Sequence, residues 1–196
     1  MTVRQTVLKA IYPVWMFISR AFGKRSKVLI NKKNVQPLQS FYNLSTQLNN
    51  GTILSFSSFK GKKLLLVNTA SDCGYTNQYS DLQTLYEEYR DMLTVIAFPA
   101  NDFKEQEKGT DEEIGNFCKI NFGVTFPIAS KGIVVRANEQ QTVFQWLTDK
   151  TKNGWNNQPP TWNFSKYLLN EDGVLVSYFD PAISPLSEEV KKAIEK

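Results

Sequence analysis

The sequence predicts an α/β fold in which helices cover both faces of a mixed β-sheet. Two short apolar runs, at 64–67 and 93–98, are typical of strands that are buried on both faces. Apolar residues at helical spacing follow the first run, and two late extended segments, 167–169 and 174–179, flank a tight turn. Buried early strands combined with a late hairpin indicate a mixed sheet between helical layers.

The composition limits the classes of function. The chain has 196 residues, of which 41% are hydrophobic, so it is long enough for one domain with a core and an appendage. It contains no histidine, which excludes sites that need an imidazole as base, metal ligand or pH switch. Its two cysteines, Cys73 and Cys118, are too few for a disulfide framework or a four-cysteine metal site. We expect a reduced pair or a redox pair, with no metal and no cofactor.

The net charge of +4 hides an asymmetry along the chain. The first 71 residues hold eleven Lys or Arg and no Asp or Glu, and eight of these basic residues lie within the first 33. The basic character therefore belongs to an N-terminal tail rather than to a folded face. This distribution argues against a nucleic-acid partner.

Residues 1–38 are expected to form a basic amphipathic extension and linker before a domain at 39–196. The apolar segment within 3–22 is interrupted by basic residues and is too short to cross a membrane. An acid-free basic helix of this kind is typical of the interface of an anionic membrane, so residues 1–33 would make a peripheral membrane contact. A helix packed on the domain or on a second subunit, and a mitochondrial transit peptide, are the alternatives.

The domain is expected to begin near Phe41 with a hairpin, because the sequence NNG at 49–51 accepts the positive φ of a tight turn. Thr110 opens a later helix with a capping box, and Ser187 caps the last helix. In chain order we expect extended segments at 44–48 and 52–56, a strand at 64–67, a helix at 76–90, a strand at 93–98, a helix after Thr110 that buries Ile114, Phe117 and Cys118, an extended piece at 126–128, a helix at 142–152, strands at 167–169 and 174–179, and a helix after Ser187. From the first buried strand this order is β-α-β-α-α-β-β-α, which is that of a thioredoxin-like fold.

Cys73 lies between the first buried strand and the first helix of the domain, a position typical of thiolate chemistry. The N–H groups and the dipole at a helix start stabilise a thiolate, so we expect the pKa of Cys73 to be lowered. No cysteine follows three residues later, which argues against a disulfide oxidoreductase. A single thiolate favours attack on a peroxide oxygen, which gives a sulfenic acid that another thiol removes. The alternative is a cysteine that only fills space in the core.

Four blocks of the sequence resemble the signature blocks of glutathione peroxidases. They are NTASDCGYT at 68–76, FPANDFKEQE at 98–107, FGVTFP at 122–127 and WNF at 162–164, and they match in order and spacing. The resemblance covers about residues 40–195. It implies a thioredoxin-like fold and a peroxidase in which Cys73 is the peroxidatic residue, in place of the selenocysteine of some members.

By the same resemblance, Gln106, Trp162 and Asn163 surround Cys73 as catalytic residues. Their amide and indole N–H groups can donate to a thiolate or to a departing oxygen, and none is a strong general base. Activation of Cys73 would then come from hydrogen bonds, and the proton for the leaving group from water or an amide. As single residues, Gln106 would be solvated, Trp162 would lie in the core, and Asn163 would serve a turn.

Cys118 matches the resolving cysteine of family members that form an internal disulfide and are recycled by thioredoxin. It lies 45 residues from Cys73, on a helix that is expected to bury it. Because a disulfide requires Cα atoms within about 7 Å, we expect residues 112–122 to unfold locally on oxidation. The alternative is that Cys118 fills a helix face.

Three positions depart from the family pattern. Ala100 and Asp102 stand where the family often has Cys and Gln, and Lys104 replaces a common glycine. These differences indicate a stiffer or differently charged loop near Gln106. The segment between Arg136 and Trp162 lacks the insertion that builds the interface of tetrameric members, so we expect a monomer whose exposed site accepts bulky hydroperoxides.

These observations predict an antioxidant oxidoreductase, a peroxidase in the response to oxidative stress that reduces hydrogen peroxide and organic or lipid hydroperoxides. Thioredoxin is the expected reductant and glutathione the alternative, because the domain has no basic cluster for glutathione's carboxylates. The basic flank after residue 22 favours a cytoplasmic location, peripheral at the inner face of the membrane. Two other functions stay open: a peroxide sensor that passes a disulfide to a partner docked through residues 1–33, and a membrane-surface scaffold.

Overall fold

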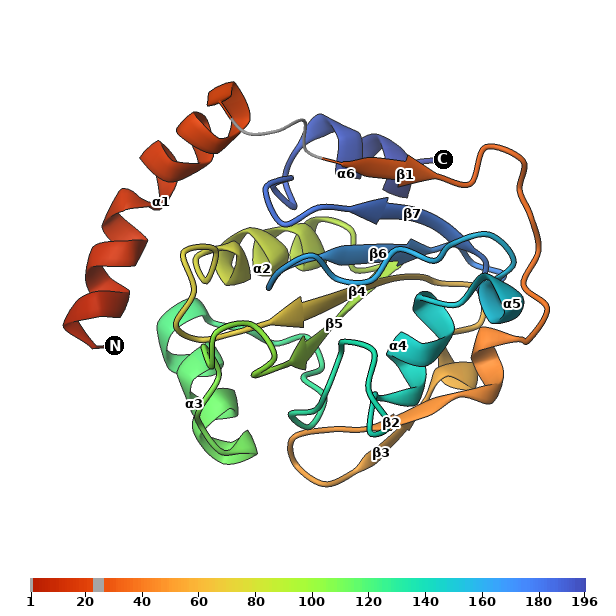
Figure 1. The fold of residues 1–196 in the computed structure, drawn as a ribbon, viewed down its shortest axis with the longest axis horizontal. Helices are drawn as coiled ribbons and strands as arrows, with labels where there is room; N and C mark the ends of the chain where they lie inside the picture. The colour runs from red at the N-terminus through yellow and green to blue at the C-terminus, as the bar shows by residue number, and fades with distance from the viewer. Residues whose placement is uncertain (1, 23–26) are drawn as a thin grey trace.

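The chain forms a mixed β-sheet with helices on both sides, as the sequence predicts (Figure 1). The structure is a computed structural model that describes residues 2–22 and 27–196, without the side chains at 9, 13 and 15–22. In chain order the elements are α1 (Val3–Phe22), β1 (Val28–Ile30), η1 (Phe41–Asn43), β2 (Ser45–Gln47), β3 (Ile53–Ser55), η2 (Phe56–Phe59), β4 (Lys63–Thr69), α2 (Gln78–Glu88), β5 (Leu93–Pro99), α3 (Asp111–Phe122), α4 (Thr142–Leu147), α5 (Lys150–Asn153), β6 (Lys166–Leu169), β7 (Leu175–Phe179) and α6 (Glu188–Ile194).

The five-stranded sheet has the order β1-β7-β6-β4-β5. Strands β4 and β5 are parallel, with Lys63 opposite Leu93 and Thr69 opposite Pro99. On its other side β4 pairs antiparallel with β6, and the late hairpin of β6 and β7 extends the sheet. Because parallel neighbours need a crossover, α2 carries the chain from the end of β4 to the start of β5. The turn after β4 therefore lies at the carboxyl edge of the sheet.

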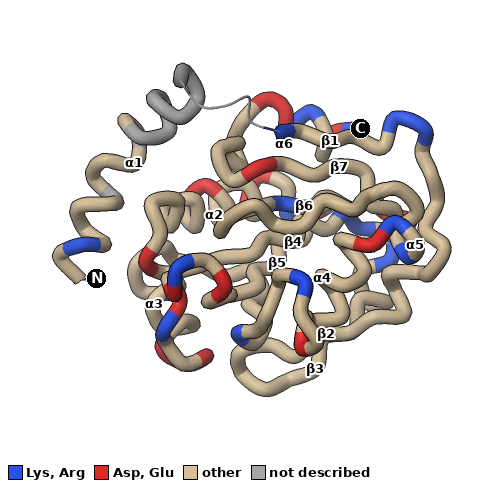
Figure 2. The backbone as a smooth tube through the Cα atoms, in the orientation of Figure 1, with Lys and Arg blue, Asp and Glu red and all other residues tan. Residues whose placement is uncertain are grey.

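Alternate residues of β4 face two separate clusters of the core. Leu65 and Val67 pack with apolar side chains of α2, α3 and α6. Leu64 and Leu66 pack instead with α4 and with the short 3₁₀ turns η1 and η2. Burial on both faces explains why this strand is a continuous apolar run in the sequence. Strand β5 has no charged residue and β4 has only Lys63, so both are nearly free of charge in Figure 2.

Two elements differ from the sequence-based expectation. Strand β1 lies inside the stretch expected to be extension and linker, and it joins the sheet where Val28 pairs with Phe179. A strand of three residues is too short to show a period, so the pattern gave no signal for it. The helix expected at 142–152 is two helices, because the side chain of Asp149 accepts from Thr151 N and caps α5 as a separate unit.

Helix α1 packs against the domain, which was one of the alternatives for this segment. Thr2 and Gln5 form a capping box at its start, because the backbone N–H of each donates to the side chain of the other at 2.7 and 3.2 Å. Tyr12 is buried, and its hydroxyl donates to Asp81 of α2 at 3.0 Å. Within residues 2–22 and 27–196, no helix is long and apolar enough to cross a bilayer. Lys24 and Arg25 of the predicted basic flank lie outside the described residues.

Candidate active site

Cys73 lies in the turn between β4 and α2, and its side chain is buried, with 1% exposed. Thr76 folds this turn, because its hydroxyl oxygen accepts from Cys73 N and its hydrogen is donated to the carbonyl of Ala70, both at 2.9 Å. Helix α2 begins only at Gln78. Cys73 therefore sits before the helix, inside a tight turn, rather than in its first turn.

Three donors converge on the sulfur of Cys73. The backbone N–H of Tyr75 donates to it at 3.4 Å, and the side chains of Trp162 and Asn163 also hydrogen-bond it. Burial raises the pKa of Cys73, and the three hydrogen bonds act in the opposite direction. The expectation of a lowered pKa was therefore wrong, because desolvation outweighs the donors and the helix begins too far along the chain.

The structure brings Gln106 to the same place. The side-chain amide of Asn163 donates to Gln106 Oε1 at 3.0 Å, and Asp72 N donates to the backbone carbonyl of Gln106 at 3.0 Å. Three loops thus meet beside the sulfur: the Cys73 turn, the loop after β5, and the loop before β6. The four residues predicted to form the site lie in these three loops.

Asn68, which the sequence analysis did not single out, ties the Trp162 loop to β4. This buried side chain donates to the carbonyl of Trp162 at 3.1 Å and accepts from Ser165 N at 3.1 Å. Its backbone carbonyl accepts from Phe164 N at 2.6 Å, and Phe164 itself has a positive φ of 68°. The ammonium of buried Lys166 donates a hydrogen bond to the carbonyl oxygen of Phe164 at 2.8 Å. These bonds position the segment that carries the two side-chain donors to Cys73.

The outer side of Trp162 is covered by the loop after β5. The ring of Phe103 lies 5.4 Å from the indole, centroid to centroid, and the ammonium of Lys104 lies 5.8 Å from it. Lys104 and Glu105 both have positive φ, at 55° and 52°. Glycine would adopt this left-handed backbone at 104 without strain, which fits the glycine that the resemblance implies at this position.

Cys118 is fully buried in α3, and both cysteines are free thiols. Its pKa is raised to about 12, first because burial disfavours the thiolate; a hydrogen bond from the Tyr79 hydroxyl lowers it in part. The expected packing of the helix is correct for Ile114 and Cys118, whereas Phe117 is only partly buried. Cys118 shares one apolar cluster with Cys73.

Glu107 is a buried carboxyl that the sequence analysis missed. Only 1% of the residue is exposed, and its carboxylate accepts from the Ser71 hydroxyl at 3.0 Å. Burial raises its pKa to about 7, and the hydrogen bonds from Ser71 oppose that rise. Its backbone N–H donates to Asn101 Oδ1 at 2.8 Å, which folds the loop over the carboxyl. The available signal was its position directly after Gln106 in the second block.

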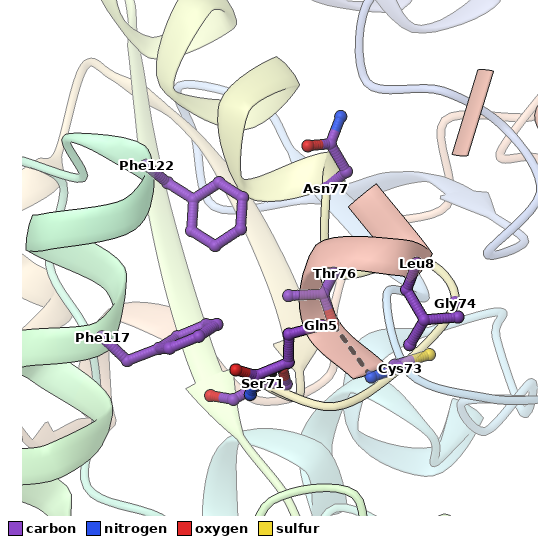
Figure 3. A pocket seen from close by; sticks show the side chains of 9 residues that line it. All are labelled: Gln5, Leu8, Ser71, Cys73, Gly74, Thr76, Asn77, Phe117 and Phe122. Carbon is purple, nitrogen blue, oxygen red and sulfur yellow. Dashed lines mark hydrogen bonds between the residues drawn. The ribbon is translucent and has the colours of Figure 1, made fainter. Parts of the chain in front are cut away.

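A small pocket of about 10 Å³ lies beside Cys73 (Figure 3). Gln5 and Leu8 of α1 and Phe117 and Phe122 of α3 form part of its wall. A volume of this size holds about one water molecule. Within the described part of the chain, no group of three or more Cys, Asp or Glu side chains could hold a metal ion.

Known proteins are similar to this chain in sequence and in fold. The family model for glutathione peroxidase matches residues 41–148. The glutathione peroxidase homolog BsaA of Staphylococcus epidermidis is 42% identical over 81% of this chain and 99% of its own. The glutathione peroxidase-like peroxiredoxin 2 of Saccharomyces cerevisiae is 38% identical over 80% of this chain and 98% of its own. The crystal structure of T. cruzi GPX1 superposes with a TM-score of 0.61 and 29% identity, covering 80% of this chain and 95% of that one.

Proposed function

The chain belongs to the glutathione peroxidase family, and from this premise we propose that it reduces hydroperoxides through Cys73. Gln106, Trp162 and Asn163 are the other catalytic residues of the proposal. The observation that carries it is the convergence of three hydrogen-bond donors on a buried sulfur. A thiol that served only packing would not need hydrogen-bond donors both from its own turn, at Tyr75, and from a distant loop, at Trp162 and Asn163.

In the first step the thiolate of Cys73 attacks one oxygen of the hydroperoxide. An S–O bond forms and the O–O bond breaks, so Cys73 becomes a sulfenic acid and the peroxide is reduced. The departing oxygen takes a proton from water and leaves as an alcohol or as water. Trp162 and Asn163 stabilise the thiolate before attack, and Gln106 orients the amide of Asn163.

In the second step Cys118 resolves the sulfenic acid. Its thiolate attacks the sulfur of Cys73, an S–S bond forms, and the hydroxyl leaves with a proton as water. Complete burial and a pKa of about 12 keep Cys118 unreactive while α3 is folded. We therefore retain the expectation that residues 112–122 unfold locally on oxidation, which would free the thiol and shorten the distance to Cys73.

Thioredoxin is the reductant we propose for the resulting disulfide. A cleft of about 440 Å³ beside Gln106 is lined by the carboxyl groups of Asp72, Glu105, Glu107 and Glu113 and by the ammonium of Lys108. Even with Asp72 paired to Arg4 and Glu107 partly protonated, the acidic groups outnumber the basic ones. This balance disfavours glutathione, which carries two carboxylates of its own. A protein dithiol needs no such pocket, because it reaches the disulfide by exchange at an exposed loop.

The test is consumption of NADPH with thioredoxin and its reductase, compared with glutathione and its reductase. We expect turnover with thioredoxin, its loss in Cys73→Ser, and much slower turnover in Cys118→Ser. After one equivalent of peroxide, mass spectrometry should find an intramolecular disulfide in the wild type. Faster turnover with glutathione in both the wild type and Cys118→Ser would overturn the choice of reductant, and a persistent sulfenic acid at Cys73 would overturn the resolving role.

The same assay separates the peroxidase from a peroxide sensor. A sensor would complete one slow cycle and accumulate as a mixed disulfide with a partner, whereas a peroxidase consumes many equivalents of peroxide. We also propose that the protein is a monomer and that its substrates include lipid hydroperoxides. We propose a cytoplasmic location, peripheral at the inner face of the membrane. The boundary at residue 38, between the N-terminal extension and the peroxidase domain, is proposed only as a functional one. It is not a structural boundary, because β1 lies before it and already belongs to the sheet of the domain.

A further inference from the structure

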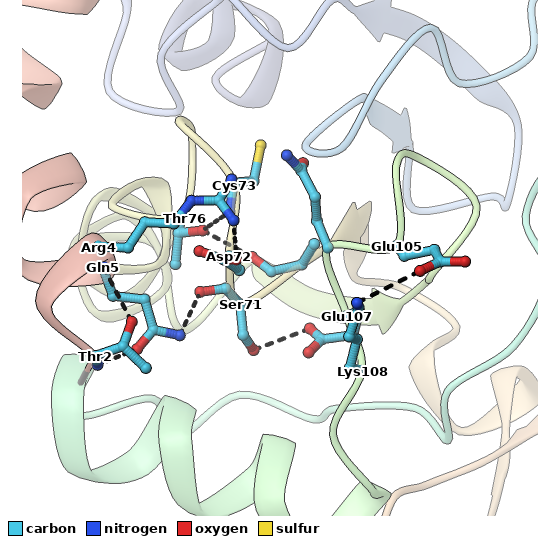
Figure 4. A network of polar contacts seen from close by, with 12 residues as sticks. Thr2, Arg4, Gln5, Ser71, Asp72, Cys73, Thr76, Glu105, Glu107 and Lys108 are labelled. Atoms are coloured by element: carbon cyan, nitrogen blue, oxygen red, sulfur yellow. Dashed lines mark hydrogen bonds and ion pairs between the residues drawn. The ribbon is translucent and has the colours of Figure 1, made fainter.

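Helix α1 is held on the candidate active site by polar contacts near its first turn. Arg4 Nη1 lies 2.6 Å from Asp72 Oδ2, directly before Cys73 in the chain (Figure 4). Gln5 Nε2 donates to the carbonyl of Ser71 at 3.1 Å. Gln5 also belongs to the capping box of the helix, so this one side chain serves both the start of α1 and part of its attachment. The position of α1 is therefore fixed relative to the Cys73 turn.

A different face of α1 carries an apolar stripe with no cover in the described structure. Val3 is 83% exposed, Val7 53%, Ile11 46% and Val14 60%. The spacing of four, four and three places these side chains on one face of a helix. On a helix of about 3.6 residues per turn, Gln5 and Tyr12 project from the side of α1 away from the stripe, whereas Arg4 lies at the edge of the stripe beside Ile11. The four stripe residues stay exposed although α1 is attached to the domain.

The charge of the surrounding sequence favours a lipid surface as the cover of the stripe. The first 71 residues contain eleven basic residues and no acidic one. A narrow apolar stripe on an acid-free basic segment is complementary to an anionic lipid interface, where aliphatic side chains enter the acyl boundary and basic groups stay with the headgroups. A second copy of this chain would place two equally basic segments against each other.

We propose that α1 binds an anionic membrane through this stripe while it stays docked on the domain, and so presents the active site to the lipid surface. The proposal deepens the proposed function, on which its catalytic part rests. Thr2 and Gln5 of α1 also line the cleft that contains Gln106, and Leu8 lines the pocket of Cys73. A lipid surface on the stripe would be about one helix diameter, roughly 10–12 Å, from both. An oxidised acyl chain that extends this far from the lipid surface would reach the site while its phospholipid stays in the bilayer.

The test of binding is co-sedimentation of the full chain with vesicles of phosphatidylcholine and phosphatidylserine, 7:3, and with pure phosphatidylcholine. We expect binding to the anionic vesicles that weakens at high salt, and a loss of at least about tenfold in Val7→Asp and Ile11→Asp, because a charge in the stripe opposes its burial. Ile53→Asp is the matched control: Ile53 is 70% exposed on β3, away from α1, and this variant should bind as the wild type does.

Three results would overturn the proposal. They are no binding by the wild type, equal binding by Val7→Asp, or equal losses in Val7→Asp and Ile53→Asp. A dimer in sedimentation velocity that Val7→Asp dissociates would assign the stripe to a second copy instead. The catalytic part is tested by turnover of a phospholipid hydroperoxide in the anionic vesicles, which should fall in Val7→Asp more than turnover of hydrogen peroxide in solution. Failure of the wild type with hydrogen peroxide would count against the proposed function and not against the lipid contact.

The docking contacts give a second readout. Arg4→Ser and Tyr12→Phe remove bonds to Asp72 and Asp81 but leave the stripe intact. We expect the double variant to bind anionic vesicles at most several-fold more weakly, because Arg4→Ser removes one basic residue. At equal amounts of bound protein, it should lose several-fold in turnover of the phospholipid hydroperoxide. Unchanged turnover with bound phospholipid hydroperoxide would mean that the orientation of α1 on the domain contributes nothing to presentation of the site.

Discussion

The side-chain amide of Asn163 donates to Gln106 Oε1 at 3.0 Å, across 57 positions of sequence. An amide nitrogen has two hydrogens, so this bond leaves the other hydrogen of Asn163 for the sulfur of Cys73, to which Asn163 also hydrogen-bonds. In the proposed mechanism, Gln106 therefore acts on the thiolate through Asn163. The two residues form a unit in which one donates and the other orients the donor.

This unit predicts different effects for the two residues. Asn163→Ala removes a donor to the thiolate, which raises the pKa of Cys73 and should slow alkylation by iodoacetamide at pH 7 by about tenfold, the equivalent of about 1.4 kcal/mol. Gln106→Ala only releases the amide of Asn163, so a smaller effect is expected. The pH dependence of alkylation checks both, and an equal rate in Asn163→Ala and the wild type would contradict the assignment of this donor.

Asn68 is expected to be needed for both stability and turnover. Its side chain is buried and makes two hydrogen bonds to the Trp162 loop. Asn68→Ala leaves the carbonyl of Trp162 and the N–H of Ser165 without these partners, which should cost about 2–4 kcal/mol in the free energy of unfolding by urea. Turnover should fall further than the loss of folded protein explains, because the donors to Cys73 move with the loop.

Asn116→Ala is a suitable control for that measurement, since Asn116 is an exposed asparagine on α3. It should leave the free energy of unfolding within about 0.5 kcal/mol of the wild type. If Asn68→Ala unfolds at the same urea concentration as Asn116→Ala, the proposed role of Asn68 in holding the loop would be refuted.

The sequence predicts the sheet and the site residues because these depend on local pattern and on the family blocks. Leu65 and Val67 alternate with Leu64 and Leu66 between two clusters of the core, which leaves a continuous apolar run. The direction in which the pKa of Cys73 shifts could not be predicted in this way, since the shift depends on how completely tertiary packing buries the turn. Burial of Glu107 follows likewise from the fold of its loop around Asn101, and the docking of α1 from single contacts such as Arg4 to Asp72.

Glu107 should make stability depend on pH. Its folded-state pKa of about 7 lies above the ordinary value of 4.5, so the folded state holds a proton that the unfolded chain has released between these values. The free energy of unfolding should therefore fall as pH rises from about 4.5 to 7, by roughly 3 kcal/mol in total, and stay level above pH 7 as far as this group is concerned. Below pH 4.5 both states are protonated and the contribution is constant.

Urea unfolding of Glu107→Gln at pH 5 and pH 8 checks this prediction. The variant lacks the titrating group, so its stability relative to the wild type should increase by about 3 kcal/mol between the two pH values. Glu105→Gln, which removes an exposed carboxylate of the same loop, controls for the change in net charge. A stability difference between Glu107→Gln and the wild type that is the same at both pH values would contradict the raised pKa.

Lys104 combines a left-handed backbone, at a φ of 55°, with an ammonium 5.8 Å from the Trp162 ring. Two substitutions separate these features, because Lys104→Ala keeps the strained φ and removes the ammonium, whereas Lys104→Gly removes both. Relief of the strain outweighs the greater freedom of glycine in the unfolded chain, so Lys104→Gly should be more stable than Lys104→Ala by about 1 kcal/mol. Lys108 has no positive φ, and there the glycine variant should be the less stable of the same pair. Thermal unfolding of the four variants tests this prediction. If Lys104→Gly is no more stable than Lys104→Ala, the loop carries no strain at residue 104. The conformation of the loop would then have to come from the contact with Trp162.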